Sequence, residues 1–334
     1  MNSSAAAVGR RFEPAAKEPR FAGRRLSLPA DFLFHKLAVA MAILVGVALL
    51  AVVAAIGYDS WPAIRTFGVY GFLKSSEWDP VAEHFGAFPF IVGTLVSSTI
   101  AMVLAVPVSF GVAVFISELA PGWIRQPVSA AVEMLAAIPS IVYGLWGLLV
   151  FAPVFADMEP WISDHIGRIP GIGALFQGPP MGIGMLTAGI VLAIMVLPYI
   201  TAIMRDVFMA TPARLKESAY AMGSTTWEVA RHIILPYTRT AVAGGVFLGL
   251  GRALGETMAV TFVIGNSNNL SASLLMPGAS IPSVIANEFT EATSRLYLSS
   301  LIYLGLILIV ITLIVQMLAV LLVRSLNRGA EGAK

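Results

Sequence analysis

The stretch RDVFMATPARLKESAYAMGSTTWEVARHIILPYTR, residues 205–239, begins with the pattern of a short helix that stops at a glycine. Thr211 followed by Pro212 predicts the helix start, because proline at the first helical position gives up an N–H group that would have no partner there. Gly223 predicts the stop, since glycine adopts the left-handed conformation that ends many helices. Helical spacing places three apolar residues on one face: Leu215, Ala219 and Met222.

A second helix is predicted directly after this glycine. Thr225 and Glu228 form a T-x-x-E capping box, which marks a helix start. We expect the helix to end at Pro236, because proline interrupts backbone hydrogen bonding. Its apolar surface comes from Trp227, Ile233 and Ile234. Two short helices joined at a glycine suggest a protruding docking surface for another protein. An amphipathic connector that lies on lipid headgroups is the alternative.

The composition of the whole chain indicates an integral membrane protein. Its 334 residues are 57% hydrophobic and only 12% charged, and the mean hydropathy is +0.83. Soluble domains carry about twice that share of charge. There is no cysteine, which excludes disulfides and cysteine-based metal sites. The four histidines lie far apart in the sequence, so we expect no metal site.

Six apolar runs are long enough to cross about 30 Å of hydrocarbon as helices. The chain is therefore predicted to be an all-α membrane protein with six transmembrane helices. Pro107 lies inside the second run, whose inner part is expected to bend or to leave the membrane before Glu118. The six predicted spans are 37–57, 86–116, 134–156, 182–204, 240–265 and 297–323.

The basic residues predict that both termini are cytoplasmic. Residues 1–36 are polar and basic, and the apolar run that follows them is too long for a cleaved signal peptide. With that tail inside, 16 of the 21 Lys and Arg residues fall in inner segments and four in outer loops. The predicted organisation is a cytoplasmic N-terminal tail, 1–36, a six-span domain, 37–323, and a cytoplasmic C-terminal tail, 324–334. The inner loop 205–239 lies within that domain.

The stretch GLGRALGETMAV, residues 249–260, places two opposite charges inside the predicted fifth span. If that span starts near Thr240, Arg252 lies about 18 Å along it, close to mid-membrane. Each charge there costs on the order of 3 kcal/mol on insertion scales. The i,i+4 spacing allows a structural ion pair between Arg252 and Glu256. Alternatively, Arg252 faces the transport pathway and offers a donor fork to an oxyanion, while Glu256 keeps the anion from binding too tightly.

Pro139 interrupts the predicted third span just beyond Glu133. One interpretation is a fixed kink whose freed backbone groups are satisfied by neighbouring helices. The other is that the backbone near Pro139 and Ser140 lines a path through the membrane, as broken helices do in membrane transporters. Glu133 itself is interpreted as an interfacial charge at the inner surface.

The inner loop resembles the EAA-x3-G-x9-I-x-L-P loop of ABC importer permeases, with serine at the second position. This resemblance implies that its first helix is a coupling helix, which docks into a groove of an ATP-hydrolysing subunit. The residues that carry the motif are Glu217, Ser218, Ala219, Gly223, Ile233, Leu235 and Pro236.

Two further stretches, 133–147 and 251–266, resemble the permease of the phosphate-specific ABC importer, and its C-type subunit most. The resemblance implies a type I ABC importer permease fold in a bacterial inner membrane. It also implies a second six-span permease of A type, an ATPase dimer, an external phosphate-binding protein and phosphate as substrate. The chain has no G-x4-G-K-[ST] loop, so we expect ATP and Mg²⁺ to be used by the partner ATPase. We expect no enzymatic activity, no cofactor and no nucleic acid.

A different class of function stays open at this point. A self-sufficient secondary transporter or channel for an inorganic anion could use Arg252 and Glu256 as an ion relay. Only the importer requires an ATPase bound through residues 212–223, so copurification separates the two. An intramembrane hydrolase would need a nucleophile and base or a metal motif, which the sequence lacks. Phosphate rather than sulfate or molybdate rests on the family resemblance alone.

Overall fold

The structure is a computed structural model that describes residues 29–331. The ends of both predicted tails, 1–28 and 332–334, lie outside the described residues. Regular structure in the described part is helical, apart from two isolated β-bridges. Six helices are long and apolar enough to cross a membrane, which confirms the prediction of a six-span all-α protein. They are Phe32–Asp59, Phe88–Leu119, Ser140–His165, Met185–Met209, Thr226–Leu254 and Arg295–Arg324.

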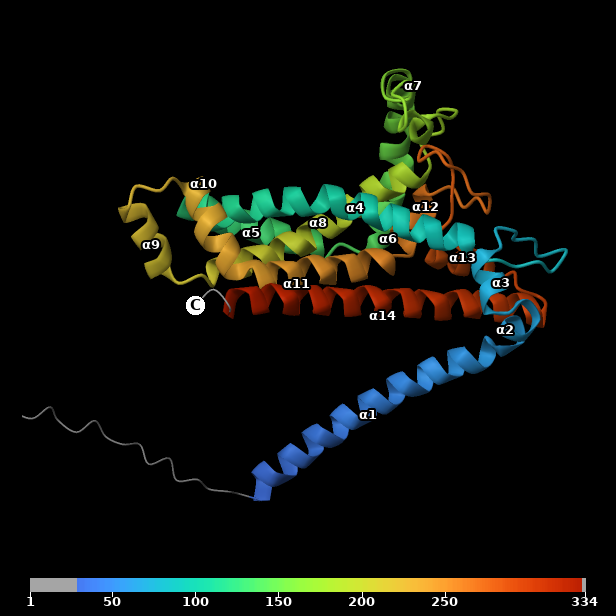
Figure 1. Cartoon of the computed structure of the whole chain (residues 1–334), viewed down its shortest axis with the longest axis horizontal. Helices are drawn as coiled ribbons and strands as arrows, with labels where there is room; N and C mark the ends of the chain where they lie inside the picture. The colour runs from blue at the N-terminus through green and yellow to red at the C-terminus, as the bar shows by residue number, and fades with distance from the viewer. Residues whose placement is uncertain (1–28, 332–334) are drawn as a thin grey trace, which may run out of the picture. The chain divides into compact units, whose positions relative to one another are not determined.

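Figure 1 shows the arrangement of the elements, whose longest connections lie between α3 and α4 and between α12 and α13. The α-helices are α1 (Pro29–Asp59), α2 (Trp61–Phe67), α3 (Val69–Lys74), α4 (Phe88–Val114), α5 (Gly122–Ala136), α6 (Ser140–Trp146), α7 (Ala152–His165), α8 (Met185–Met209), α9 (Ala213–Ala221), α10 (Thr226–Val229), α11 (Leu235–Leu254), α12 (Met258–Val263), α13 (Ile281–Glu288) and α14 (Arg295–Glu331). The π-helical turns are η1 (Phe115–Leu119), η2 (Gly147–Phe151) and η4 (Ala230–Ile234), and η3 (Gly173–Phe176) is a 3-10 turn.

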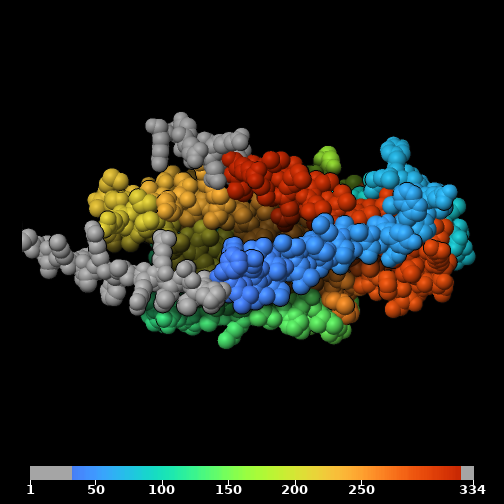
Figure 2. All heavy atoms as spheres, turned by 90° about the horizontal axis from the view of Figure 1, so that it is seen from below, coloured from blue at the N-terminus to red at the C-terminus, as the bar shows by residue number. Residues whose placement is uncertain are grey.

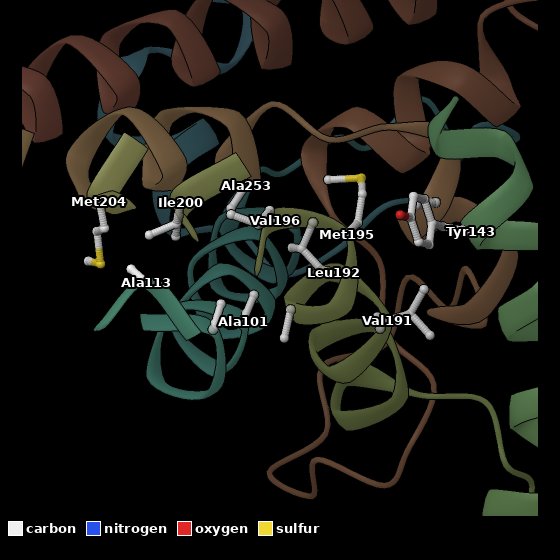
Figure 3. Close-up of a cluster of buried hydrophobic side chains, with 14 of the residues drawn as sticks. Ala101, Ala113, Tyr143, Val191, Leu192, Met195, Val196, Ile200, Met204 and Ala253 are labelled. Carbon is white, nitrogen blue, oxygen red and sulfur yellow. The ribbon is translucent and has the colours of Figure 1, made fainter. Parts of the chain in front are cut away.

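The chain divides into two compact units, Met1–Val52 and Val53–Lys334. The described part of the first unit is the beginning of α1. The second unit is built around α8, the most deeply buried of the six candidate spans. Apolar side chains of α4, α6, α8 and α11 gather there, and Figure 3 shows Val191, Leu192 and Val196 of α8 among them. Such a core suits a helix that is apolar on all sides.

Glycines bring α11 close to α8. A Cβ atom added at Gly245 or Gly249 would lie 2.7 Å from the side chains of Ile203 or Ile200, which is too short for a real contact. Small residues allow such close helix packing in membranes. Gly245 and Gly249 are therefore packing residues, whereas a Cβ atom added at Gly244 would meet no other atom within 4 Å.

Opposite ends of the second unit carry the two sets of loops. The helices α9 and α10 lie at one end and α2, α3 and α13 at the other (Figure 1), and Figure 2 shows the same separation of yellow from cyan and orange-red atoms. An aromatic cluster fills the second end, where Trp78 lies 4.9 Å from both Phe85 and Phe90 between ring centroids. Glu288 of α13 accepts 2.7 Å hydrogen bonds from Trp78 Nε1 and Tyr297 Oη there.

The predicted fifth span, 240–265, is wrong at both ends. The helix starts at Thr226 and continues through Pro236, although the sequence predicted that the second loop helix would end there. The π turn η4 precedes Pro236, and its wider hydrogen-bond spacing accommodates the missing proline N–H. The span then ends at Leu254, and α12 forms a separate short helix.

Two other spans differ in detail from the prediction. The second remains helical through Pro107 and reaches Leu119, whereas the predicted run ends at residue 116. The predicted third span, 134–156, is divided, because α5 ends at Ala136 and the long apolar helix begins only at Ser140. Each proline is thus accommodated in its own way, which proline content alone does not reveal.

Candidate translocation pathway and coupling surface

Arg252 and Glu256 do not form the ion pair that their spacing allowed. Arg252 lies in the last turn of α11, whereas Glu256 follows the end of that helix. The ion pairs among the described residues do not join the two side chains. Glu256 Oε1 instead accepts a 3.3 Å hydrogen bond from the backbone N–H of Ala259, in the first turn of α12. The break at Gly255 removes the shared helical face on which the pairing depended.

Arg252 is exposed on the protein surface and stacks on a tyrosine. Its guanidinium carbon lies 5.4 Å from the ring centroid of Tyr199, a cation–π distance. Tyr199 lies near the middle of α8, about 21 Å from Met185 and about 15 Å from Met209 at 1.5 Å per residue. Arg252 therefore lies level with the middle of α8, although it is at the end of its own helix.

Pro139 marks a complete break between two helices rather than a kink within one. It is the N-cap residue of α6, and half-buried Ser140 is the first residue of that helix. The hydroxyl of Tyr143 donates a 2.8 Å hydrogen bond to the carbonyl of Leu135, across the break. The chain thus satisfies part of the backbone that the break leaves free.

The two interrupted helices meet directly after their breaks. A Cβ atom added at Gly144 of α6 would lie 3.0 Å from the Cα atom of Ala259 of α12 and 2.8 Å from the ring of Phe262. The breaks at 137–139 and 255–257 therefore place Arg252, Glu256 and Tyr143 in one region of the molecule.

Glu133 takes part in a charged cluster at the end of the bundle that carries α9. Its Oε1 atom accepts a 2.8 Å bond from Arg205 Nη1, and Asp206 Oδ1 accepts from Nη2 of the same guanidinium at 2.6 Å. The Arg205 side chain is only 10% exposed, so these carboxylates offset its burial. The sequence indicated an interfacial charge at Glu133, but no local signal indicated a partner in α8.

The inner loop contains the two predicted short helices. The first, α9, begins at Ala213, so Pro212 is its N-cap residue and not its first helical residue as predicted. Gly223 has a φ of 90°, as its role as a helix stop requires. The predicted capping box is confirmed, since Glu228 Oε2 accepts from Thr225 N at 2.7 Å and Thr225 Oγ1 accepts from Glu228 N at 3.3 Å. The second helix continues into α11 without interruption.

The apolar side chains of this loop are divided between the core and the surface, and Val229 and Ile234 are buried. Ala219 is 1% exposed, but Met222 is 80% exposed and Trp227 is 58% exposed. The predicted apolar face of α9 therefore packs against the protein only at its centre, because α9 is too short and too peripheral to bury more. Of the other motif residues, Glu217, Ser218, Gly223 and Pro236 are exposed, and Ile233 and Leu235 are half-buried.

Sequence reasoning missed two side chains of this region. Tyr199, which stacks on Arg252, follows Pro198 in an apolar span, and a phenol in that setting was an available but weak signal. Lys216 contacts Glu118, and nothing in the sequence links residues so far apart. Within the described part of the chain, no three His, Asp or Glu side chains gather in a group that could hold a metal ion.

Interrupted spans beside a central helix, with a helix–glycine–helix loop at one end, define a type I ABC importer permease fold. The solved bacterial alginate ABC transporter, in complex with its alginate pentasaccharide-bound periplasmic protein, contains a similar chain. The TM-score is 0.59 at 17% identity, over 87% of this chain and 95% of that one. A further structure of an alginate importer gives 0.58 at 17% identity, over 88% and 96%. At this identity the likeness shows the fold alone.

The chain belongs to the binding-protein-dependent transport system inner membrane component family, whose model matches residues 105–328. It is therefore a multi-pass inner membrane protein. It is 54% identical over 300 residues to the phosphate transport system permease protein PstC of Xylella fastidiosa, covering 90% of this chain and 92% of that one. The protein of the same name from Pasteurella multocida is 53% identical, covering 91% and 94%. The probable counterpart from Methanocaldococcus jannaschii is 37% identical, covering 79% and 84%.

Proposed function

We propose that this chain is a transmembrane permease subunit of an ATP-driven phosphate importer and forms half of its pathway. The observation that carries the proposal is a sequence identity of 54%, over 90% of this chain, to a permease named for phosphate transport. The site agrees with an anionic substrate, because Arg252 presents an exposed guanidinium level with the middle of α8. Arginine binds planar oxyanions through paired N–H donors.

The pathway in this proposal runs past the two breaks. Arg252 offers its donor fork to the passing phosphate, and Tyr199 holds the guanidinium on one side. Glu256 lowers the net positive field, so that a doubly charged ion is released as well as bound. Backbone near Pro139 and Ser140 lines the same region, since α6 begins there and packs on α12. Discontinuous helices near the bilayer centre form substrate sites in other transporters.

The inner loop docks on a partner ATPase. Glu217, Ser218, Ala219 and Gly223 form the coupling helix and its stop, and Ile233, Leu235 and Pro236 join it to α11. Exposed Met222 and Trp227 offer apolar contact area for a groove. Two ATPase copies use ATP and Mg²⁺, a second six-span permease of A type completes the pathway, and an external phosphate-binding protein delivers the substrate. Both termini and this loop are cytoplasmic.

Copurification and uptake test this function together. The tagged chain should bring an ATPase out of mildly solubilised membranes, and cells should take up radiolabelled phosphate in an ATP-dependent manner. Met222→Asp should reach the membrane but lose the ATPase and most uptake, because it places a charge on the docking surface. The matched control is Met181→Asp, in the loop at the opposite end of the bundle, which should retain the ATPase.

Three results would contradict the proposal. Phosphate uptake without any bound ATPase would favour the secondary transporter. If unlabelled sulfate suppressed the uptake of the radiolabel and unlabelled phosphate did not, the substrate would be a different oxyanion. An ATPase that remains bound to Met222→Asp at wild-type yield would place the docking surface elsewhere.

A further inference from the structure

A largely buried charge pair attaches the coupling helix α9 to the end of the second span. Lys216 Nζ lies 2.5 Å from Glu118 Oε1, and their side chains are only 16% and 7% exposed. The same ammonium group donates a 3.2 Å hydrogen bond to the carbonyl of Phe208, in the last turn of α8. One side chain therefore connects three elements: α9, the end of the second span, and the end of the fourth.

Glu118 is held in a well-defined position. It lies in the π turn η1, whose end is capped by Arg125, since Nη2 of that guanidinium donates to the carbonyls of Ser117 and Ala120 at 3.1 and 3.4 Å. Phe208 is fully buried, and its ring packs edge-to-face on Phe110 of α4 at 5.7 Å. The two partners of Lys216 thus belong to rigid parts of the bundle.

The coupling helix has few other attachments. Among the residues of α9, all of which the structure describes, Ala219 alone is buried. Separating a buried ion pair leaves an uncompensated charge and is strongly unfavourable. Lys216 is therefore the strongest single restraint on movement of α9 relative to the spans.

The second span in turn contacts the fourth close to the stacked tyrosine. Ser109 of α4 donates a 3.0 Å hydrogen bond to the carbonyl of Leu197 in α8. Tyr199 follows two residues later and stacks on Arg252. A contiguous set of contacts therefore extends from α9 to the proposed pathway, and coupling between such sites requires a direct experimental test.

We infer that Lys216 is a positioning residue that makes the coupling helix move as one body with the inner ends of the second and fourth spans. A displacement of α9 by the ATPase then reaches Tyr199 and Arg252 through α4 and α8. This inference rests on the proposed function, since it assumes an ATPase bound to α9.

Charge exchange tests the pair. Lys216→Met and Glu118→Gln should each retain the ATPase and its ATP hydrolysis, but phosphate taken up per ATP hydrolysed should fall about tenfold, within the range of measured coupling energies. The double variant Lys216→Glu with Glu118→Lys should recover only part of that ratio, because it restores the opposite charges but not the hydrogen bond to the carbonyl of Phe208. Retained ATPase binding and ATP hydrolysis separate this effect from a merely structural loss, which would lower both. Arg168→Gln is the matched control, because it breaks an ion pair whose side chains are 79% and 68% exposed.

Cross-linking gives a second measurement that does not depend on the charges. The chain has no cysteine, so Glu118→Cys and Lys216→Cys can be joined specifically by a short bismaleimide. Uptake per ATP should be low before linking and should rise after it, because the link replaces the ion pair. If the single variants do not reach the membrane, this double variant and the charge exchange carry the test.

Three outcomes would overturn the inference: unchanged uptake per ATP in both single variants, no recovery in the exchanged pair with the complex intact, or loss of uptake on linking. The last would show that the pair must open during transport. The wild-type chain separates this failure from that of the proposed function. If it binds no ATPase, the proposed function has failed; if it does and the variants behave normally, only the inference has failed.

Discussion

The charge of Arg252 is only partly compensated within the chain. An arginine at the bilayer centre costs about 3 kcal/mol on insertion scales. A cation–π contact such as the one with Tyr199 offsets about 1 kcal/mol of that cost. Glu256 contributes little directly, because its carboxylate accepts from the backbone of α12 rather than from the guanidinium. The remaining cost is explained if a partner subunit or a passing anion also contacts Arg252.

Arg252→Gln should assemble with its partners and lose phosphate uptake by roughly 30-fold, the effect of removing a charged hydrogen bond worth about 2 kcal/mol. Phosphate uptake by Arg252→Lys should lie between that of the wild type and that of Arg252→Gln, since lysine keeps the charge but not the paired donors. The measurement is radiolabelled phosphate uptake, normalised to complex quantified in the membrane. Normal uptake by Arg252→Gln would remove it from the pathway, and loss of the complex would assign it a structural role.

Glu256→Gln separates the effect of the negative charge of Glu256 from the effect of its hydrogen bond to the start of α12, at the break at 255–257. The glutamine carbonyl can still accept from Ala259 N, so α12 should keep its start and the complex should form. Uptake should nevertheless decrease several-fold, because the site binds the anion more tightly without the neighbouring negative charge. Saturation kinetics provide the measurement, with a lower phosphate concentration at half-maximal rate and a lower maximal rate. An unchanged maximal rate would mean that Glu256 only caps α12.

At the scale of elements, the sequence predicted local features well and long-range ones poorly. The capping box at Thr225 and the stop at Gly223 depend on a few neighbouring residues, and both are confirmed. Pro236 failed as a helix end because a π turn absorbs its missing hydrogen bond. The pairing of Arg252 with Glu256 failed because a helix break three residues after Arg252 was not foreseen. Contacts such as Lys216 with Glu118 depend on the tertiary fold, so periodicity carries no signal for them.

The glycine turn of the coupling loop provides a prediction at this scale. Gly223 has open space around it but a φ of 90°, so Gly223→Val should act through backbone strain of about 1–3 kcal/mol rather than through collision. The variant should reach the membrane and show weaker ATPase binding or uptake, whereas Gly223→Asn should be milder. Gly122→Val is the control, since Gly122 also has open space but no positive φ. Equal copurification and uptake for both valine variants would show that the turn has no role.

For the whole molecule, the number of spans was more predictable than their ends. Six apolar runs were sufficient to give six spans, because crossing a bilayer requires a minimum length of apolar helix. The ends depend on how each proline and glycine is accommodated, and the candidate site lies at two of these ends. This is why the sequence could single out Arg252 and Glu256 as candidates, while their mutual geometry and the contact with Tyr199 could not be foreseen.

The orientation of the molecule is a separate prediction from the 16-to-4 distribution of basic residues. Ser76→Cys and Ser271→Cys should react in intact cells with a thiol reagent that does not cross membranes, whereas Ser218→Cys should react only after permeabilisation. The cysteine-free wild-type chain is the background control. If Ser218→Cys alone were labelled in intact cells, the orientation of the chain in the membrane would be the opposite of the predicted one.

The helix that begins at the capping box has a mechanical consequence. It continues from Thr226 to Leu254 without a break, so about 39 Å of rod separates its start from Arg252 at 1.5 Å per residue. Apart from the π turn η4 and the N–H group missing at Pro236, its backbone hydrogen bonding is continuous and resists torsion. A roll of α11 about its own axis would therefore turn Arg252 as well. Because the guanidinium extends sideways from the axis, such a roll sweeps it across the face of Tyr199. The loop would then control which way the charge points as well as whether the spans move apart.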